Sequence, residues 1–371
     1  MKKEKREIMP YVQGSMKELN RKTVFELIAE MREITRVEIA EVTKSSMPTI
    51  LKITNFLIEQ QIISLVGLEK TARGRRPHVL HFEPDSLLSI GLSFDGHHVI
   101  ASLINYYGEE KKCIEKDSDA SFSDMIENGF CEIIEELMKD MKREHIKSVG
   151  ISVSGSVDTE NAKVHFGAFS ELGIEREINE SVRILSGKVK LPVYFFNDVN
   201  AAATGEYVLR KMKNTDLVYI YVGEGTGAGV ILDGILRTGH HFYTGEIAHM
   251  VFDADFCIDL SKPGWMESQL SRKMIEKVSQ DKNVQTDYVA RYISLIIANI
   301  CNVLDIENVV VGGEIIEDMG DALIDRTNAY LGHLSLFPVI LTRSVCRHSS
   351  LIGAASMAMD KEITTILTDN E

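Results

Sequence analysis

Carboxylate, amide and imidazole side chains follow apolar runs at several points in the C-terminal two thirds of the chain. Asn197 and Asp198 come after four apolar residues, Glu246 and His249 are three positions apart, and Glu267 follows a Pro-Gly-Trp-Met run. In an α/β fold, ligands bind at the C-terminal ends of the strands. Carboxylates and amides suit hydroxyl groups, which both donate and accept hydrogen bonds. These residues predict a site for a sugar-like ligand, although each alone could be a surface charge, and Asp198 could cap a helix beginning near residue 201.

A glycine run at residues 225–229, Gly-Thr-Gly-Ala-Gly, would let backbone N–H groups approach a phosphate or another ligand oxygen. The alternative is a tight hairpin whose glycines supply positive φ angles, and the run alone favours neither. Gly312 and Gly313, which follow an apolar segment, form a second point where another group can approach the backbone closely.

The elements that must position these residues alternate between strands and helices, which predicts an α/β fold. Apolar runs predict strands at 87–94, 98–105, 148–153, 192–196, 217–222, 229–232 and 308–311, and helical periodicity predicts helices at 122–141, 179–188, 201–211, 285–304 and 318–331. Two blocks, 89–105 and 217–233, each begin with a strand, a glycine turn and a returning strand. This duplication predicts two similar lobes with a cleft between them.

The N-terminal residues 1–82 predict a different kind of domain. Leu19, Val24, Leu27, Ile28 and Met31 recur with helical spacing. Two capping signals follow. Thr35 with Glu38 predicts a capping box on a helix over 36–43, and Ser46 predicts the cap of a third helix, with Pro48 in its first turn, that runs to about residue 60. Two short helices joined by a tight turn predict a helix-turn-helix, in which Ser46, Thr49 and Lys52 lie where the third helix would meet DNA.

A basic loop between two strand-like runs predicts a wing on this head. The loop carries Arg73, Arg75 and Arg76, whose guanidinium groups would suit the minor groove of DNA. The head holds 15 basic and 10 acidic residues, although the whole chain has a net charge of −14. A basic head on an acidic body favours nucleic acid as the partner of the head alone. The alternative is a docking module with a solvated basic loop.

Five scattered cysteines without a Cys-x-x-Cys motif argue against a disulfide framework and favour the cytoplasm. No signal peptide is visible, and the longest apolar run, 293–304, is too short to cross a membrane. We therefore expect no membrane partner.

Several ordered motifs of the body resemble those of the ROK family, which comprises sugar-responsive repressors and sugar kinases. They lie at 150–158, 196–202, 223–234, 245–249, 312–313 and 351–355, and the Gly-Arg-Arg-Pro wing is similar to that of the xylose-repressor and N-acetylglucosamine-repressor branch. The resemblance implies a winged helix-turn-helix at 1–82 before a two-lobed actin-like, ribonuclease-H-like domain. The first lobe would span 83–198, completed by a C-terminal helix at 350–371, and the second 199–349.

The resemblance also implies which residues bind the sugar in the cleft between the lobes. By motif position these are Asn197, Asp198, Glu246, His249 and Glu267, with Ser154 and Gly155 beside them.

Departures from the family pattern argue against catalysis. Where the kinases have Asp-x-Gly-Gly-Thr in the first phosphate hairpin, this chain has Ser93, Asp95 and His97 at the changed positions. An acidic side chain there would repel the phosphates that a kinase must neutralise. We therefore expect no enzyme activity, with Asp198 a vestigial catalytic base. The second glycine loop, Gly225, Thr226 and Gly227, would be a vestigial phosphate loop.

The zinc-binding loop of the family is also altered. His249 and Cys257 remain as ligands, but Asp259 and Trp265 replace two cysteines. Structural zinc requires four ligands in a closed tetrahedron. We therefore expect no structural zinc and no other cofactor, with the loop held instead by packing of Trp265.

These features together predict a sugar-responsive transcriptional regulator, most simply a repressor, whose partners are operator DNA and a sugar or sugar phosphate. Paired DNA half-sites predict a homodimer or homotetramer. Two alternatives remain: an ATP-dependent sugar kinase with an added head, and a DNA-binding dimer that has lost its ligand.

Overall fold

The computed structural model describes residues 13–66, 78–94, 97–158, 163–165, 176–256 and 263–368. The chain forms two compact units, one of residues 1–88 with 360–371 and the other of 89–359. The boundary therefore falls at 88, compared with the expected 82. The expected C-terminal helix is α13 (Ser349–Thr368), and its last turns group with the head rather than with the first lobe.

The head contains the expected helix-turn-helix. It comprises α1 (Gln13–Met31), β1 (Glu33–Thr35), α2 (Arg36–Thr43), α3 (Met47–Glu59), β2 (Ile63–Val66), β3 (Val79–Phe82) and a 3-10 turn at Pro84–Ser86. The capping box is confirmed, because the Glu38 N–H donates to Thr35 Oγ1 (3.3 Å) and the Thr35 N–H donates to the Glu38 carboxylate (2.8 Å). Lys44 adopts the left-handed conformation, which ends α2 and makes the turn.

Burial separates the two sides of these helices. The inward face of α3 consists of Ile50, Ile53, Phe56 and Leu57, which are all buried. The expected stripe on α1 is partly wrong. Val24 and Ile28 are buried, but Leu19 and Met31 are each 54% exposed.

A three-stranded antiparallel sheet in the order β1-β3-β2 packs beside the helices and supplies the strands of the winged fold. The short strand β1 was not expected. The end of α13 also belongs to this unit, because Arg21 Nη1 of α1 donates to the Leu367 carbonyl oxygen (2.9 Å). The same guanidinium lies 3.9 Å from the centre of the Phe56 ring. Ile363 and Leu367 are buried, so α13 contributes to the packing of the head.

The body has two sheets with the same topology, which confirms the predicted duplication. The first has the order β11-β7-β4-β5-β6 and the second β16-β15-β12-β13-β14, so each runs fifth, fourth, first, second, third along its own part of the chain. The strands of the first are β4 (Leu88–Phe94), β5 (His98–Asn105), β6 (Glu110–Asp117), β7 (Ile146–Val153) and β11 (Val193–Asn197). Those of the second are β12 (Leu217–Val222), β13 (Thr226–Leu232), β14 (Ile235–Arg237), β15 (Asn308–Gly312) and β16 (Ile340–Arg343).

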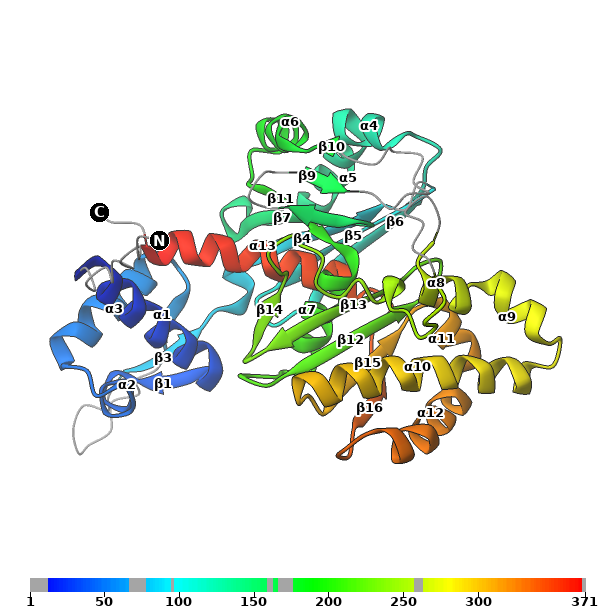
Figure 1. Cartoon of the computed structure of the whole chain (residues 1–371). Coiled ribbons are helices and arrows are strands. Elements are labelled where there is room, and N and C mark those ends of the chain that lie inside the picture. The colour runs from blue at the N-terminus through cyan, green and yellow to red at the C-terminus, as the bar shows by residue number, and fades with distance from the viewer. Residues whose placement is uncertain are drawn as a thin grey trace, which may run out of the picture. The chain divides into compact units, whose positions relative to one another are not determined.

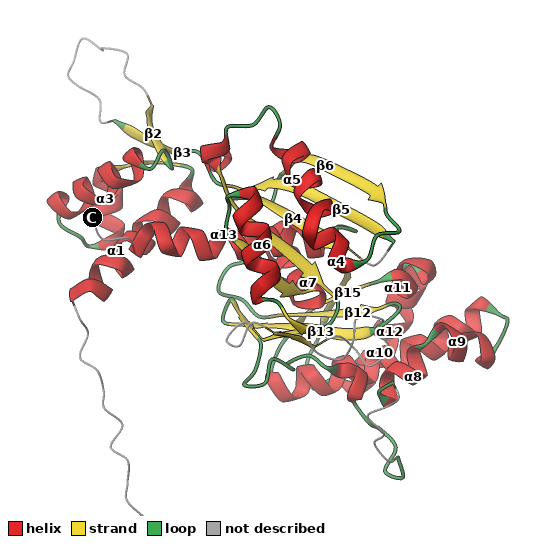
Figure 2. Cartoon of the chain, turned by 90° about the horizontal axis from the view of Figure 1, so that it is seen from above, coloured by secondary structure: helices red, strands yellow, loops and turns green. Residues whose placement is uncertain are grey.

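Helices cover both sheets (Figures 1 and 2). The first sheet carries α4 (Phe122–Asp124), a π-turn at Met125–Gly129, α5 (Phe130–Met138) and α6 (Asn179–Val189), and the second carries α10 (Lys282–Leu304) and α12 (Asp321–Leu334). The remaining elements are 3-10 turns at Arg143–His145 and Ile247–His249, a small sheet of β8 (Ser156–Asp158), β9 (Lys163–His165) and β10 (Arg176–Glu177), and helices α7 (Asp198–Leu209), α8 (Trp265–Leu270), α9 (Arg272–Val278) and α11 (Glu314–Met319). The helix expected at 318–331 is thus two helices, and the one at 122–141 is interrupted.

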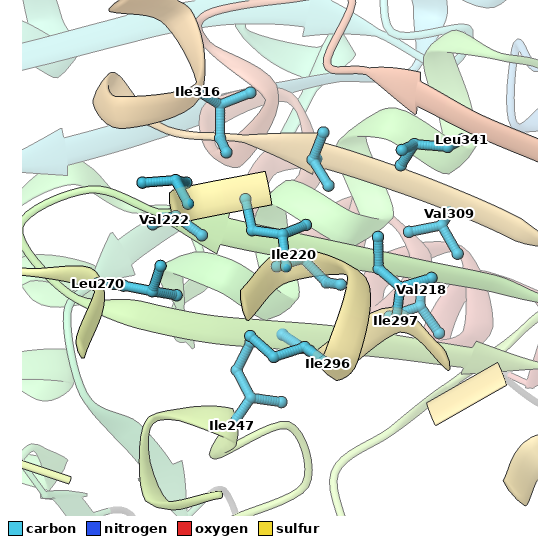
Figure 3. Close-up of a cluster of buried hydrophobic side chains, with 14 of the residues drawn as sticks. Val218, Ile220, Val222, Ile247, Leu270, Ile296, Ile297, Val309, Ile316 and Leu341 are labelled. Carbon is cyan, nitrogen blue, oxygen red and sulfur yellow. The ribbon is translucent and has the colours of Figure 1, made fainter. Parts of the chain in front are cut away.

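Apolar strands and helices form the core of the second lobe. Figure 3 shows Val218, Ile220 and Val222 of β12 gathered with Ile296 and Ile297 of α10. α10 has the length and hydropathy of a membrane-crossing helix. One face of α10, including Val289, Ile293 and Ile297, is buried in this cluster, whereas Val303 is 79% exposed, as in an amphipathic core helix.

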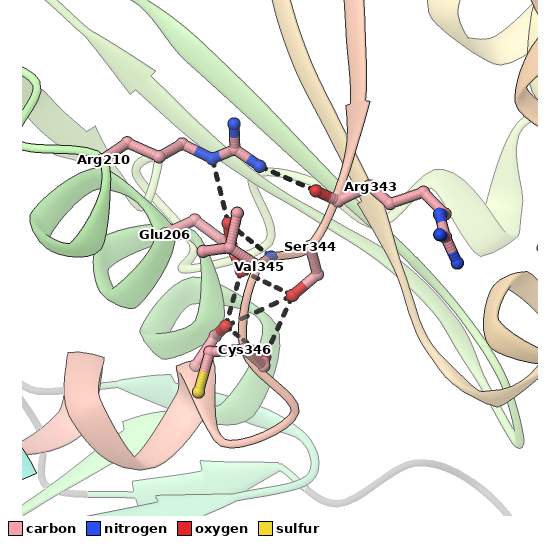
Figure 4. A network of polar contacts seen from close by, with 7 residues as sticks. Glu206, Arg210, Arg343, Ser344, Val345 and Cys346 are labelled. Atoms are coloured by element: carbon pink, nitrogen blue, oxygen red, sulfur yellow. Dashed lines mark hydrogen bonds and ion pairs between the residues drawn. The ribbon is translucent and has the colours of Figure 1, made fainter. Parts of the chain in front are cut away.

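The buried carboxylate of Glu206 on α7 forms hydrogen bonds with the segment between β16 and α13 (Figure 4). The Glu206 side chain is 0% exposed and pairs with Arg210 Nε at 3.0 Å. It accepts hydrogen bonds from Ser344 Oγ (2.5 Å), Ser349 Oγ (2.6 Å) and the Val345 N–H (3.1 Å). Burial of a carboxylate is unfavourable unless it is paired and hydrogen-bonded, and here both conditions are met.

Candidate functional site

The junction between β11 and α7 brings together four of the predicted ligand residues. The Asn197 side chain caps α7 by accepting a hydrogen bond from the Asn200 N–H (2.8 Å), and its Nδ2 donates to the Gly155 carbonyl oxygen (2.9 Å). Ser154 Oγ donates to Asp198 Oδ2 (2.7 Å). The alternative role for Asp198 as a helix cap is wrong, because Asn197 takes that place and α7 begins at Asp198 itself.

Asp198 is a half-buried carboxylate in a polar setting. Burial raises its pKa above the ordinary value, and the negative charge of Glu314 acts in the same direction. Hydrogen bonds from Ser154 and from the Val199 N–H (2.8 Å) oppose this shift by stabilising the charged form. The carboxylate is therefore held in one orientation by the protein and can still accept hydrogen bonds from a ligand.

Glu246, His249 and Glu267 form the other part of the site. Burial raises the pKa of Glu246, the charges of Glu267 and Asp198 raise it further, and His249 opposes them. The Glu267 carboxyl likewise has a raised pKa because of burial, opposed by the Gly264 N–H and by His249. These groups therefore lie within electrostatic reach of one another and of Asp198. Neighbouring protein atoms remove part of the water around Glu246, but Glu246 and His249 each keep an exposed surface that a ligand can contact.

Gly245 positions the Glu246–His249 turn. Its φ angle is +90°, and a Cβ atom there would lie 1.8 Å from the Ala228 carbonyl oxygen. The Ala228 N–H donates to the Gly245 carbonyl oxygen (2.8 Å), which fixes the turn on β13. Only glycine satisfies both the conformation and the close approach.

The glycine run at 225–229 lies mainly in β13 rather than in a loop, because Thr226 and Gly227 are strand residues. The predicted hairpin is present, because β12 and β13 pair antiparallel on either side of the turn at 223–225, but Gly225, Gly227 and Gly229 do not have the positive φ angles expected of it. A Cβ at Gly227 would lie 3.1 Å from Val199, and one at Gly229 would lie 2.4 Å from the Ala203 Cβ. The glycines of the strand therefore let α7 pack closely on β13. Gly225 lies near the ligand residues, with its Cβ position 3.6 Å from the Glu267 carboxylate.

A tyrosine–glutamate pair that the sequence analysis missed lies at the β12–β13 turn. Tyr221 Oη donates to the Glu314 carboxylate, with distances of 2.8 and 3.0 Å to its two oxygens. A Cβ at Gly223 would lie 1.8 Å from Glu314 Oε2, so this carboxylate rests against the turn. Glu314 follows Gly312 and Gly313, whose close contacts with Tyr219 and Val222 confirm the predicted close approach. An acidic residue directly after the glycine pair was the available signal.

Other predicted site residues are only partly described. Ser93 is the second-last residue of β4, and His97 directly precedes β5. Asp95, Cys257 and Asp259 lie outside the described residues. Trp265 packs edge-on against Phe252 and Tyr292, with ring centres 6.0 Å apart in both pairs. This contact agrees with the expected packing role of Trp265.

The predicted DNA-contacting residues lie at the start of α3. Ser46 caps this helix, and its Oγ is 2.8 Å from Thr49 Oγ1, so the two hydroxyl groups are bonded to each other. Lys52 is exposed on the second turn. Arg36 Nε of α2 donates to Thr54 Oγ1 (2.8 Å), which fixes α2 against α3. Arg73, Arg75 and Arg76 lie outside the described residues.

Comparison with known proteins identifies relatives of the body and of the whole chain. The model of the ROK family matches residues 89–361. A xylose repressor of Caldicellulosiruptor bescii is 28% identical over 75% of this chain and 70% of its own length. The xylose repressor of Bacillus subtilis is 23% identical over 94% and 97%, respectively. The transcriptional dual regulator NagC of Escherichia coli K12 is 22% identical over 95% of both chains.

Solved structures likewise fall into regulators that match nearly the whole chain and kinases that match about three quarters of it. A ROK family transcriptional regulator, homologous to the E. coli MLC protein, superposes with a TM-score of 0.77 at 20% identity and covers 95% of this chain and 98% of its own. A ROK family glucokinase from Streptomyces griseus, in complex with glucose and AMPPNP, has a TM-score of 0.62 at 19% identity and covers 74% and 99%. Over 95% of the chain the fold is thus the same as in that structure, with an N-terminal helix-turn-helix before an actin-like body.

Proposed function

The chain belongs to the ROK family, and from this premise we propose that it is a sugar-responsive transcriptional repressor. The head would bind operator DNA, and the site around Asp198 would bind a sugar. One observation carries this proposal: a helix-turn-helix and a group of polar side chains suited to hydroxyl groups occur in one chain that aligns almost end to end with the xylose repressor of Bacillus subtilis and with NagC. The similarity to the Streptomyces griseus glucokinase, by contrast, covers only 74% of the chain.

Binding of the sugar is expected to change operator affinity by about 5- to 150-fold, the usual range of coupling between two sites. The measurement is fluorescence anisotropy with DNA from upstream of the genes that adjoin this one. It is made at fixed salt with and without a panel of pentoses, hexoses and N-acetylhexosamines. A sugar works only if it prefers one conformation of the protein. Operator binding that no sugar alters would contradict the proposal, provided that binding of the sugar itself has been measured.

The wing arginines are expected to contribute salt-dependent affinity. The double substitution Arg75→Ala with Arg76→Ala removes two cations that neutralise phosphates, so the slope of log affinity against log salt should fall by about 2. A matched pair of changes on the body, Arg183→Ala with Lys188→Ala, should leave that slope unchanged. If both double variants bind the operator as the unaltered protein does, the wing does not contact DNA.

We infer that the body has lost phosphoryl transfer. Ser93, Asp95 and His97 replace the residues of a kinase phosphate hairpin, and the Glu314 carboxylate rests against Gly223 at the second glycine turn. A nucleotide phosphate placed beside that carboxylate would be repelled, since transfer depends on neutralising phosphate charge. Asp198 is then a ligand residue that has no catalytic task.

No turnover is expected when ATP, Mg²⁺ and each sugar of the panel are assayed with a coupled detection of ADP. The nucleotide should also leave the melting temperature unchanged. Sugar-dependent release of ADP that Asp198→Asn abolishes would show that the chain is an ATP-dependent sugar kinase. The inference that the body has lost phosphoryl transfer would then be wrong.

The remaining proposals concern cofactors and assembly. We propose that the Cys257 loop holds no structural zinc, because only His249 and Cys257 remain of the family ligands. A homodimer or homotetramer follows from the paired half-sites that helix-turn-helix proteins bind. A cytoplasmic location follows from the DNA partner and fits the free thiols of Cys113, Cys131, Cys301 and Cys346.

A further inference from the structure

A thiol, an imidazole and a carboxylate meet at the edge of the first sheet, in a part of the body that the proposed function does not use. Glu110 and Cys113 are on β6, and His348 directly precedes α13. One possible ligand atom from each residue lies within 4.8 Å of those from the other two. More than 230 residues separate His348 from the other two in sequence, so the tertiary fold creates this cluster.

A β-bulge is what places Glu110 and Cys113 on the same side of the sheet. In a regular strand, residues three positions apart point to opposite faces. In β6, however, Cys113 pairs with Ser102 and Glu110 pairs with Ile104, with a register shift between Leu103 and Ile104. The one additional residue in β6 therefore turns Glu110 to the face of Cys113, as bulges beside functional sites do.

Hydrogen bonds fix the Glu110 side chain and the backbone of His348. The fully buried Ser102 donates through Oγ to Glu110 Oε2 (2.7 Å). The His348 N–H donates to Cys346 Sγ (3.3 Å), and the His348 carbonyl oxygen accepts from the Leu351 N–H (3.0 Å) at the start of α13. His348 Nε2 lies 3.7 Å from Glu115 Oε1, and this second carboxylate shares the face of Cys113 because it is two positions along β6.

The local charge favours a cation. Burial raises the pKa of the Cys113 thiol, and the negative charges of Glu110 and Glu115 raise it further against the opposing hydrogen bond with Ser102. A divalent metal ion would neutralise these carboxylates and displace the thiol proton to solvent, as metal binding to cysteine requires.

We propose that Glu110, Cys113 and His348 form a binding site for a divalent transition metal ion, with Zn²⁺ the best match. Zinc binds thiolate, imidazole and carboxylate donors in a tetrahedron, whereas Ca²⁺ and Mg²⁺ prefer oxygen ligands alone. The fourth position is left for water or for Glu115. An ion there would join β6 to the start of α13, next to the Ser344–Ser349 segment that Glu206 holds.

The test uses the full chain, stripped of metal with a chelator and titrated first with Zn²⁺ and then, in a fresh sample, with Co²⁺ as a spectroscopic probe. We expect one equivalent of either ion to bind at this site and Co²⁺ to give a thiolate-to-cobalt charge-transfer band. Cys113→Ser should abolish that band, and His348→Ala should abolish stoichiometric binding. Ser102→Ala, which frees Glu110, should weaken binding by about 10- to 100-fold.

Two control variants distinguish this site from others. Cys131→Ser changes a half-buried thiol on α5, and Cys257→Ser removes a remaining ligand of the family zinc loop; neither should alter the band. Circular dichroism and melting curves of each metal-free variant establish that it is folded. The proposal is overturned if neither ion binds, if the band survives in Cys113→Ser, or if Cys257→Ser removes it.

Discussion

Glu206→Ala is expected to lower the free energy of unfolding by about 3–5 kcal/mol, the usual effect of removing one partner from a buried ion pair. The change leaves Arg210, the Ser344 and Ser349 hydroxyls and the Val345 N–H without their common acceptor. Arg210 and the two hydroxyls keep their contacts with the Arg343 and Cys346 carbonyl oxygens, so the loss is that of the charge-assisted hydrogen bonds to Glu206. Urea denaturation followed by circular dichroism measures the difference in free energy of unfolding. The samples should contain no sugar or other ligand, because a ligand that binds only the folded state would raise the apparent stability.

The matched control is Glu180→Ala, which removes the carboxylate of another Glu–Arg pair on a helix surface. That pair is exposed on both sides, at 63% for Glu180 and 76% for Arg183, so its loss should leave the urea midpoint nearly unchanged. Glu206→Gln, which keeps an acceptor oxygen, should fall between the two. An unaltered midpoint in Glu206→Ala would mean that the network in Figure 4 does not hold α7 to the β16–α13 segment.

Asp198→Ala is expected to weaken sugar binding by about 10- to 100-fold, because a hydrogen bond to a charged group contributes about 1.5–3 kcal/mol. Glu246→Gln should also weaken sugar binding. The sugar is first identified by a concentration-dependent rise in melting temperature, and its affinity is then measured by titration calorimetry. Glu307→Gln serves as the control for altered net charge. It changes an exposed carboxylate that directly precedes the N-terminal end of β15.

The affinity for sugar should also decline on acidification. Burial raises the pKa of both Asp198 and Glu246, so these carboxylates take up protons at a higher pH than exposed ones and then accept fewer hydrogen bonds. If no sugar raises the melting temperature at any pH, the body has lost its ligand and serves only in assembly.

Local chemistry explains what the sequence predicted well. The Thr35–Glu38 capping box and the Ser46 cap depend on residues three positions apart, so the spacing alone locates the ends of α2 and α3. The duplicated strand–turn–strand blocks likewise predicted two lobes of equal topology. Even so, α7 was expected to begin near 201 with Asp198 as its possible cap, whereas it begins at Asp198 with Asn197 as the cap, which the hydrogen bond from the Asn200 N–H reveals.

Long-range contacts explain what could not be predicted. Glu314 and Tyr221 are 93 positions apart, and although the place of Glu314 after the glycine pair marks it as a candidate, the sequence does not indicate that Tyr221 is its partner. Glu110 and Cys113 have the spacing of residues on opposite faces of a strand, and only the bulge in β6 brings them together. The ligand residues were located by motif resemblance, whereas the hydrogen bonds that orient Asp198 became visible only in the structure.

The head is built from two stretches of chain that the entire body separates, since residues 360–368 of α13 pack in the same unit as α1. During translation, the helix-turn-helix is therefore made long before the segment that contacts Arg21. A chain interrupted within the body would lack buried Ile363 and Leu367 of its own head. The packing of the head is thus completed only after the body has been synthesised, so a truncated product should have a less stable helix-turn-helix than the full chain.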